Sequence, residues 1–164
     1  MTSLQAKIIK WDLALNTKTT MGPYDTHTGP GGKLMYAKSL DALILISETP
    51  SVWNPATVTK TVMNITGGSI TLTGKTAADW CDELGCVVLW DTADRRRILT
   101  LTPTGDPHSM PWQLGKIELN PKNTLTPSSP HANGTYGRFF YSRRLSGVGI
   151  LNATNEPVYF YALR

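Results

Sequence analysis

Cysteine and histidine are scarce in this sequence, and their scarcity excludes two common ways of holding a small fold together. Only Cys81 and Cys86 are present among 164 residues. Two cysteines are too few for a disulfide scaffold, although the four residues between them leave a local bridge open. The histidines stand far apart, at His27, His108 and His131, so no second pair of ligands completes a zinc site. We therefore predict two ordinary thiols, no metal site and no cofactor.

A long apolar run is also missing. The longest one, residues 42–46, has the length of a single strand, whereas a membrane helix needs roughly 20 apolar residues. Residues 1–10 are largely polar and do not form the apolar centre of a signal peptide. We expect no membrane partner and no secretion by a signal peptide.

Motifs that carry catalysis are absent as well. The sequence has no Gly-x-Ser-x-Gly, no His-Glu-x-x-His and no phosphate-binding P-loop. Its one acidic cluster, Asp79 with Asp82 and Glu83, falls on a predicted short helix. Three carboxylates there are more simply a solvated face than a pair facing each other across a cleft. We predict that the chain is not an enzyme and has no catalytic residue.

Charged residues are few, at 17% of the chain against a usual level of about 25%. Disordered chains have the opposite balance, and hydrophobic residues make up 40%, so we expect a folded domain. A length of 164 residues suits one domain. The net charge of +4 is too mild to indicate nucleic acid, and we expect no nucleic-acid partner.

Threonine, glycine and proline are abundant instead, which is typical of many short strands joined by turns. We predict an all-β fold, a sandwich or jelly-roll-like single domain over residues 1–164, with no internal repeat. One short helix is expected over residues 77–84, with Thr76 as its N-cap and Gly85 at its end. Hairpins are expected between 57–65 and 69–73 and between 86–90 and 96–102. The ten or so strands cover residues 5–11, 42–47, 57–65, 69–73, 86–90, 96–102, 114–119, 136–142, 147–151 and 158–163.

Two long stretches lack apolar periodicity: residues 16–33, an extended arm or loop, and residues 120–134. Ordering such an arm costs about 1–2 kcal/mol per residue in backbone entropy, and its backbone groups need partners. We predict that residues 16–33 add as a strand to the edge of another protein chain. The alternative is that the arm straps its own domain, with Met21, Tyr24 and Leu34 as anchors. The predicted contact residues are Pro23, Tyr24, Gly29, Pro30, Gly31 and Gly32.

A basic cluster enters the strand that follows a turn with two aspartates. Together with Arg143 and Arg144 in a later turn, it would form a cationic patch for carboxylates or phosphates. The alternative is local pairing with Asp91 and Asp94, which stand close in the sequence. The cluster consists of Arg95, Arg96 and Arg97.

Five tryptophans could build a contact surface. Trp53 and Trp112 lie next to prolines in predicted loops, where an exposed ring would mark a partner site. The alternative is that each ring covers the edge of the core, since tryptophan is highly buried on average.

Several features together resemble small virion proteins of tailed bacteriophages, the capsid decoration (cement) proteins, and more loosely the β-sandwich modules of tails. They are the start Met1-Thr-Ser3, the arm with Gly29-Pro-Gly-Gly32, the threonine-rich strands and the aromatic run of residues 157–164. The resemblance implies a homo-oligomer that binds the major capsid protein or another virion protein and stabilises the shell. It also implies a location in the virion, assembled in the host cytoplasm.

Two other functions stay open from the sequence. A carbohydrate- or receptor-binding module, such as a tail component, would need tryptophans exposed together in one groove. An enzyme on a jelly-roll scaffold would need clustered metal ligands, and the scattered histidines argue against it.

Overall fold

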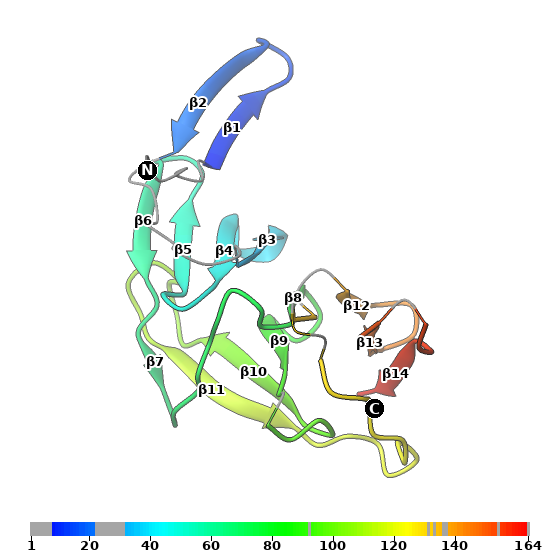
Figure 1. Ribbon diagram of the computed structural model, residues 1–164. Helices are drawn as coiled ribbons and strands as arrows, with labels where there is room; N and C mark the ends of the chain where they lie inside the picture. The colour runs from blue at the N-terminus through cyan, green and yellow to red at the C-terminus, as the bar shows by residue number, and fades with distance from the viewer. Residues whose placement is uncertain are drawn as a thin grey trace.

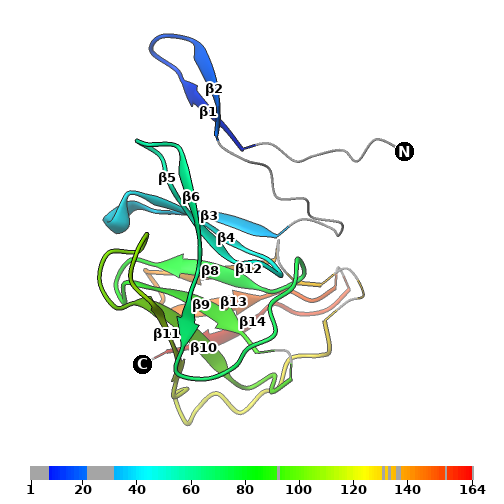
Figure 2. The ribbon, with the colours of Figure 1, turned by 90° about the vertical axis from the view of Figure 1, so that its left-hand side faces the viewer.

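The chain folds into stacked β-sheets, shown by a computed structural model that describes residues 8–21, 32–91, 93–130, 132, 134–135, 138–153 and 155–163. These residues contain fourteen strands and one 3-10 turn, η1 (Lys38–Leu40). The predicted all-β, sandwich-like architecture is confirmed (Figures 1 and 2).

Three sheets and one separate hairpin make up the fold. The hairpin joins β1 (Ile8–Asp12) and β2 (Thr17–Met21). The first sheet is an antiparallel meander of β3 (Lys33–Ala37), β4 (Ala42–Ile46), β5 (Ser51–Asn54) and β6 (Thr59–Val62). The middle sheet, in the order β7-β11-β10-β9-β8, contains β7 (Ile65–Thr66), β8 (Ala78–Cys81), β9 (Cys86–Trp90), β10 (Ile98–Pro103) and β11 (Trp112–Ile117). The last sheet contains β12 (Phe139–Ser142), β13 (Gly147–Ile150) and β14 (Tyr159–Ala162).

The middle sheet is buried on both faces, which explains why all five residues of β9 are apolar and buried. Val87 and Leu89 belong to the core shared with the first sheet. Val88 and Trp90 point the other way, into the core shared with the last sheet. Alternation along one strand therefore supplies two cores, because successive side chains of a strand lie on opposite faces.

The β1–β2 hairpin stands clear of both cores (Figures 1 and 2). Leu13 and Leu15 at its tip are 77% and 72% exposed, and Ile9 and Trp11 along β1 are about half exposed. The Asp12 carboxylate accepts hydrogen bonds from the backbone N–H groups of the two residues Ala14 and Leu15, each at 3.0 Å, and so holds the turn closed.

The predicted helix over residues 77–84 is wrong. That segment contains β8 and the first three residues of the four-residue turn that leads to β9, and Gly85 closes the turn at φ 60° instead of ending a helix. Trp80 and Cys81 belong to different cores, and only an extended chain sends neighbouring side chains to opposite sides. Burial on both faces thus overrides the local helix signals.

The predicted arm over residues 16–33 is wrong at its start. Thr17–Met21 forms β2, whose residues pair with β1 in the register Ile9↔Thr20 and Trp11↔Lys18. Residues 22–31 lie outside the described part of the chain. The second predicted loop holds, since residues 120–130 contain no strand.

The hairpin expected between residues 57–65 and 69–73 is also wrong. β6 pairs with β5, and β7 pairs in parallel with β11. The backbone N–H of Met63 bonds to the carbonyl of Pro50, and that of Trp112 to the carbonyl of Asn64. The chain therefore passes from the first sheet to the middle sheet after β6, and residues 69–73 do not pair with residues 57–65. The second predicted hairpin is confirmed as β9 and β10.

The expectation of a chain without internal repeats is wrong. The hairpins β3–β4, β8–β9 and β12–β13 each have a four-residue turn that ends in a left-handed residue, at Asp41 (φ 45°), Gly85 (φ 60°) and Ser146 (φ 46°). Each turn lies within a seven-residue pattern. In order, the pattern is an aromatic residue, a small residue, two variable residues, leucine, the left-handed residue and a second small residue. The three copies are residues 36–42, 80–86 and 141–147.

The protruding hairpin repeats β5 and β6. Residues 11–21 and 53–63 have the sequences WDLALNTKTTM and WNPATVTKTVM. Asp12 and Asn54 accept the same pair of backbone N–H bonds, and in each copy the lysine lies over the tryptophan ring, at 4.8 and 5.8 Å from its centroid. The hairpin therefore has the structure of the outer half of a sheet.

Candidate functional site

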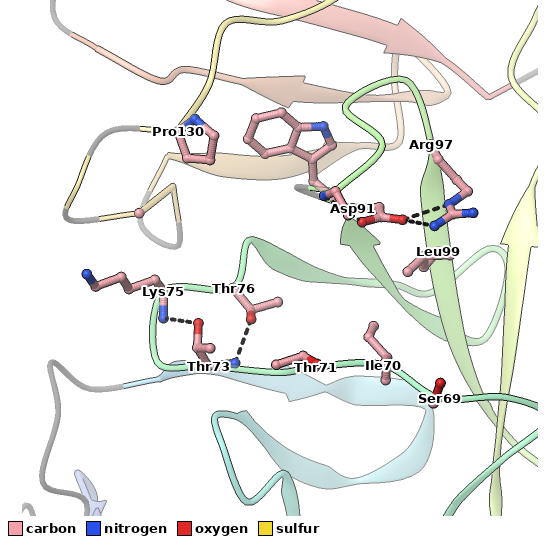
Figure 3. A pocket seen from close by; sticks show the side chains of 13 residues that line it. Ser69, Ile70, Thr71, Thr73, Lys75, Thr76, Asp91, Arg97, Leu99 and Pro130 are labelled. Carbon is pink, nitrogen blue, oxygen red and sulfur yellow. Dashed lines mark hydrogen bonds and ion pairs between the residues drawn. The ribbon is translucent and has the colours of Figure 1, made fainter.

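A cleft of about 480 Å³ lies between residues 69–76 and the turn that joins β9 to β10 (Figure 3). Hydroxyl groups line one wall, but some of them shape the wall itself. The Thr76 hydroxyl accepts the backbone N–H of Thr73 at 2.9 Å, and the Thr73 hydroxyl accepts that of Lys75 at 3.2 Å. The Lys75 ammonium donates to the carbonyl of Ala132 at 2.6 Å. The cleft thus offers small polar groups that are partly engaged already.

The opposite wall carries an ion pair between Asp91 and Arg97 (Figure 3). The Arg97 Nε donates to Asp91 Oδ2 at 2.7 Å, and its Nη2 donates to the same oxygen. Burial opposes ionisation of Asp91, but the bonds from Arg97 and from two backbone N–H groups outweigh it and hold its pKa below the ordinary 3.8. A carboxylate with a lowered pKa is a weak general base.

The other two arginines of the basic cluster bind backbone carbonyls. Arg95 Nη1 donates to the carbonyl of Pro127 at 2.9 Å, and Arg96 Nη2 to that of Asn123 at 2.8 Å. All three arginines precede β10, which begins at Ile98, so they lie in a turn and not on a strand. The alternative of local pairing is correct for Arg97. Arg95 and Arg96 instead hold the long loop of residues 120–130 against the sheets.

The predicted cationic patch does not form. Arg143 pairs with Glu83 in the turn before β9, at 3.2 Å, whereas Arg95–Arg97 lie in the turn after it. A strand of five residues spans about 16 Å, so the two groups lie at opposite ends of β9. Exposed Arg144 follows Arg143 in the same turn.

Neither predicted tryptophan is exposed. Trp53 lies on β5 and is 2% exposed, and Trp112 begins β11 and is fully buried. Of the five tryptophans, all of which the structure describes, only Trp11 on the protruding hairpin is exposed. One exposed tryptophan cannot form the stacking platform that a carbohydrate-binding module would need.

Of the six contact residues predicted in the arm, Gly32 is the one that the structure describes. A Cβ at this position would collide with the carbonyl oxygen of Ile46 at the end of β4. The close backbone approach expected of Gly32 is thus made with its own first sheet. The other five, Pro23, Tyr24, Gly29, Pro30 and Gly31, lie outside the described residues.

The two cysteines face each other across β8 and β9, and both are free and buried. Burial and the neighbouring thiol of Cys81 raise the pKa of Cys86 to about 12, so this thiol is not a reactive thiolate at neutral pH. Within the described segments no three His, Cys, Asp or Glu side chains come together as a metal site. No helix there has the length and apolar character to cross a membrane.

Sequence reasoning missed two apolar surfaces. One is the hairpin tip, where Leu13 and Leu15 flank an alanine within a turn. The other is the outer face of the last sheet, where Phe140 and Phe160 lie on either side of Gly149 in one cross-strand row. Leucines inside a turn and glycines inside a strand were the available signals, since turns are normally polar and strand glycines mark a close approach.

These two surfaces, and not the polar cleft, are the candidate functional sites. Exposed apolar side chains that lie together in a patch mark sites of contact with other proteins. No protein-family model matches the chain, and no curated protein is similar to it in sequence.

Proposed function

We propose that this chain is a structural protein that works by binding other protein chains, of the capsid decoration (cement) type that stabilises a phage shell. The β1–β2 hairpin is the observation that carries the proposal. It holds Ile9, Trp11, Leu13 and Leu15 in water, outside both cores. Burying one leucine side chain contributes about 1.5–3 kcal/mol, so covering this element is strongly favourable.

We expect the β1–β2 hairpin to be stabilised by binding a partner protein. Isolated two-stranded hairpins are marginally stable in water, and β1 and β2 pair only with each other among the described strands. No other described strand pairs with their outer edges, which are where a partner would add a strand. The Asp12 side chain and the Lys18–Trp11 contact hold the tip in one shape, which lowers the entropy cost of binding.

The virion setting comes from the sequence resemblance. That resemblance supports the major capsid protein or another virion protein as the proposed partner, with the chain as an oligomer on the shell. The carbohydrate-binding alternative has no observation in its favour, because a single exposed tryptophan, Trp11, cannot form a platform.

The proposal is tested by replacing both tip leucines, Leu13→Ser with Leu15→Ser. Binding to shells of the phage that encodes the chain should weaken at least about 100-fold, because two buried leucines contribute about 3 kcal/mol or more. Co-sedimentation of the protein with shells measures the loss. The thermal midpoint should not change, since both side chains lie outside the cores.

Leu125→Ser is the matched control, because Leu125 is 69% exposed but lies in the loop of residues 120–130. It should bind like the wild type. Equal binding by the tip variant, or no binding of the wild type to any shell, would contradict the proposed function.

A further inference from the structure

Each sheet has two distinct faces that the internal repeat defines. We call one face the front. It carries the two small residues of the repeat and the residues two positions away from them along each strand, which lie on the same face. It comprises Ala37, Ala42 and Ile44 in the first sheet, Cys81, Cys86 and Val88 in the middle sheet, and Ser142, Gly147 and Gly149 in the last sheet. The back face carries the aromatic residue of the repeat. It comprises Tyr36 and Leu43, Trp80 and Val87, and Tyr141 and Val148 in the same order.

The same front-to-back contact occurs twice in the molecule. Ile44 on the front of the first sheet shares a core with Val87 on the back of the middle sheet. Val88 on the front of the middle sheet shares the other core with Val148 on the back of the last sheet. The sheets therefore stack in one direction, each repeating the contact of the one before.

Among the described strands, this direction leaves the front of the last sheet without a neighbouring sheet, and beside the back of the first sheet it leaves only the two-stranded β1–β2 hairpin. On the front of the last sheet, Phe140 is 47% exposed. In its register, Phe140 occupies the place of Met35, which is buried in the first sheet. On the back of the first sheet, Leu34 is 44% exposed, although its equivalent Phe139 is buried in the last sheet. Both open faces are thus copies of faces that are covered elsewhere in the molecule.

We propose that the front of the last sheet binds the back of the first sheet of a second copy of this chain. The two internal contacts supply the chemistry of this interface, which is apolar on both sides. Gly149 has no side chain, and a Cβ there would collide with the ring of Phe140. The phenylalanine rings therefore lie over the glycine strand and present a flat surface to the incoming sheet.

The arrangement of the sheets predicts a closed pair. β8 contacts both β3 and β12, and the sheets fan outward from these three strands (Figure 1). Radial arrays of four-stranded sheets close with four to eight sheets. Two copies supply six sheets, whereas three copies would supply nine, so we infer a dimer with two identical head-to-tail contacts.

The protruding hairpin fits this array. It repeats the outer half of a sheet and lies beside the back of the first sheet, where Ile9 and Lys10 line a cavity of about 360 Å³ with Tyr36 and Leu43. The Lys10 ammonium donates to the carbonyl of Pro55 at 3.2 Å. The last sheet of the second copy would fill the inner half of the same layer. The hairpin tip points away from the first sheet (Figure 2), so the tip proposed to contact the shell is a different surface from this interface.

The test uses two variants of the full chain, Phe140→Asp and Leu34→Asp, each at a half-exposed position. Light scattering should give the wild type twice the chain mass of 18.0 kDa and each variant 18.0 kDa, with circular dichroism unchanged. An equal mixture of the two variants should dimerise again, at least tenfold more tightly than either alone. Phe140→Asp keeps an intact first-sheet back and Leu34→Asp an intact last-sheet front, so one contact of the two survives. Leu125→Asp should leave the mass at that of the wild type.

Three outcomes would overturn the inference. They are a monomeric wild type, a Leu34→Asp variant that still dimerises, and a mixture that stays monomeric. The second would mean that two last-sheet faces bind each other. The inference extends the proposed assembly role to a second surface, and the two claims fail separately: a monomer whose tip still binds shells refutes only the dimer, and a dimer whose tip variant still binds shells refutes only the tip contact.

Discussion

At the scale of single residues, the two glycines of β13 meet different neighbours. A Cβ at Gly147 would collide with the backbone carbonyl of Tyr161, which cannot move without disturbing β14. A Cβ at Gly149 would meet only the far end of the half-exposed Phe140 ring, which can swing away. Gly147 is therefore a requirement of the fold, and Gly149 shapes the surface.

Alanine at these two positions should therefore have different effects on stability and on dimerisation. Gly147→Ala should lower the free energy of unfolding by about 2 kcal/mol, as overpacking against a fixed backbone does. Gly149→Ala should cost less than about 1 kcal/mol, because a flexible side chain absorbs it, but should weaken dimerisation by displacing the ring. Urea unfolding measures the first effect and light scattering the second. Equal stability losses would contradict this account of the two sites.

The ion pair beside the cleft predicts a pH dependence of stability. The folded pKa of Asp91 lies below its unfolded value of about 3.8, so its contribution is complete above that value and is lost as pH falls through the folded pKa. Asp91→Asn should cost about 1 kcal/mol at pH 7, a modest figure because Arg97 is partly exposed. The difference from the wild type should shrink towards pH 2.5.

Urea unfolding of both proteins at pH 7 and pH 2.5 measures this change. Arg97→Gln removes the Asp91–Arg97 ion pair by changing the arginine instead of the aspartate. This variant should lose the same pH-dependent part of the free energy of unfolding. A stability difference that is equal at both pH values would mean that the charge on Asp91 is not its cause.

At the scale of elements, the four-residue turn is the recurring unit. Five hairpins use it, and each ends in a left-handed residue: Asn16, Asp41, Val58, Gly85 or Ser146. Asparagine, aspartate and glycine adopt this conformation readily, whereas a β-branched residue is strained there. Val58 at φ 59° is thus the misfit of the set.

Replacing Val58 by the residue that its repeat carries should relieve that strain. Asn16 holds the equivalent place in the β1–β2 hairpin, so Val58→Asn should raise the free energy of unfolding by about 1 kcal/mol. The thermal midpoint should rise by about 2–4 °C. Ser146→Val, at the left-handed position of the β12–β13 turn, should lower stability by a similar amount. A neutral or destabilising Val58→Asn would show that tertiary contacts of the valine outweigh its backbone strain.

These turns also show where sequence patterns succeed and where they fail. The hairpin of β9 and β10 could be predicted because its apolar strands flank a turn rich in aspartate, a purely local signal. Residues 77–84 have equally good local helix signals, but burial of Trp80 and Cys81 in two different cores decides their conformation. Long-range burial is not visible in a short window of sequence.

At the scale of the whole molecule, composition was enough to predict the all-β class. It could not predict the order in which the three sheets pack on one another. The repeat is hard to see because its small positions hold alanine, cysteine, serine or glycine, and only pairing across strands shows that they are equivalent. The candidate site was missed for a related reason. Trp53 and Trp112 are both buried, and Trp112 lies in a core with residues far away in the sequence. Leu13 and Phe140 are exposed on a turn and a strand whose local sequence does not mark them as surface positions.

We propose that this chain is an assembly protein whose stacked sheets continue into a second copy. The molar mass of the purified full chain in solution, determined by light scattering over a range of micromolar concentrations, tests it most directly. The account predicts a dimer of twice 18.0 kDa that becomes monomeric on Phe140→Asp. A wild-type mass of 18.0 kDa at every concentration would contradict it.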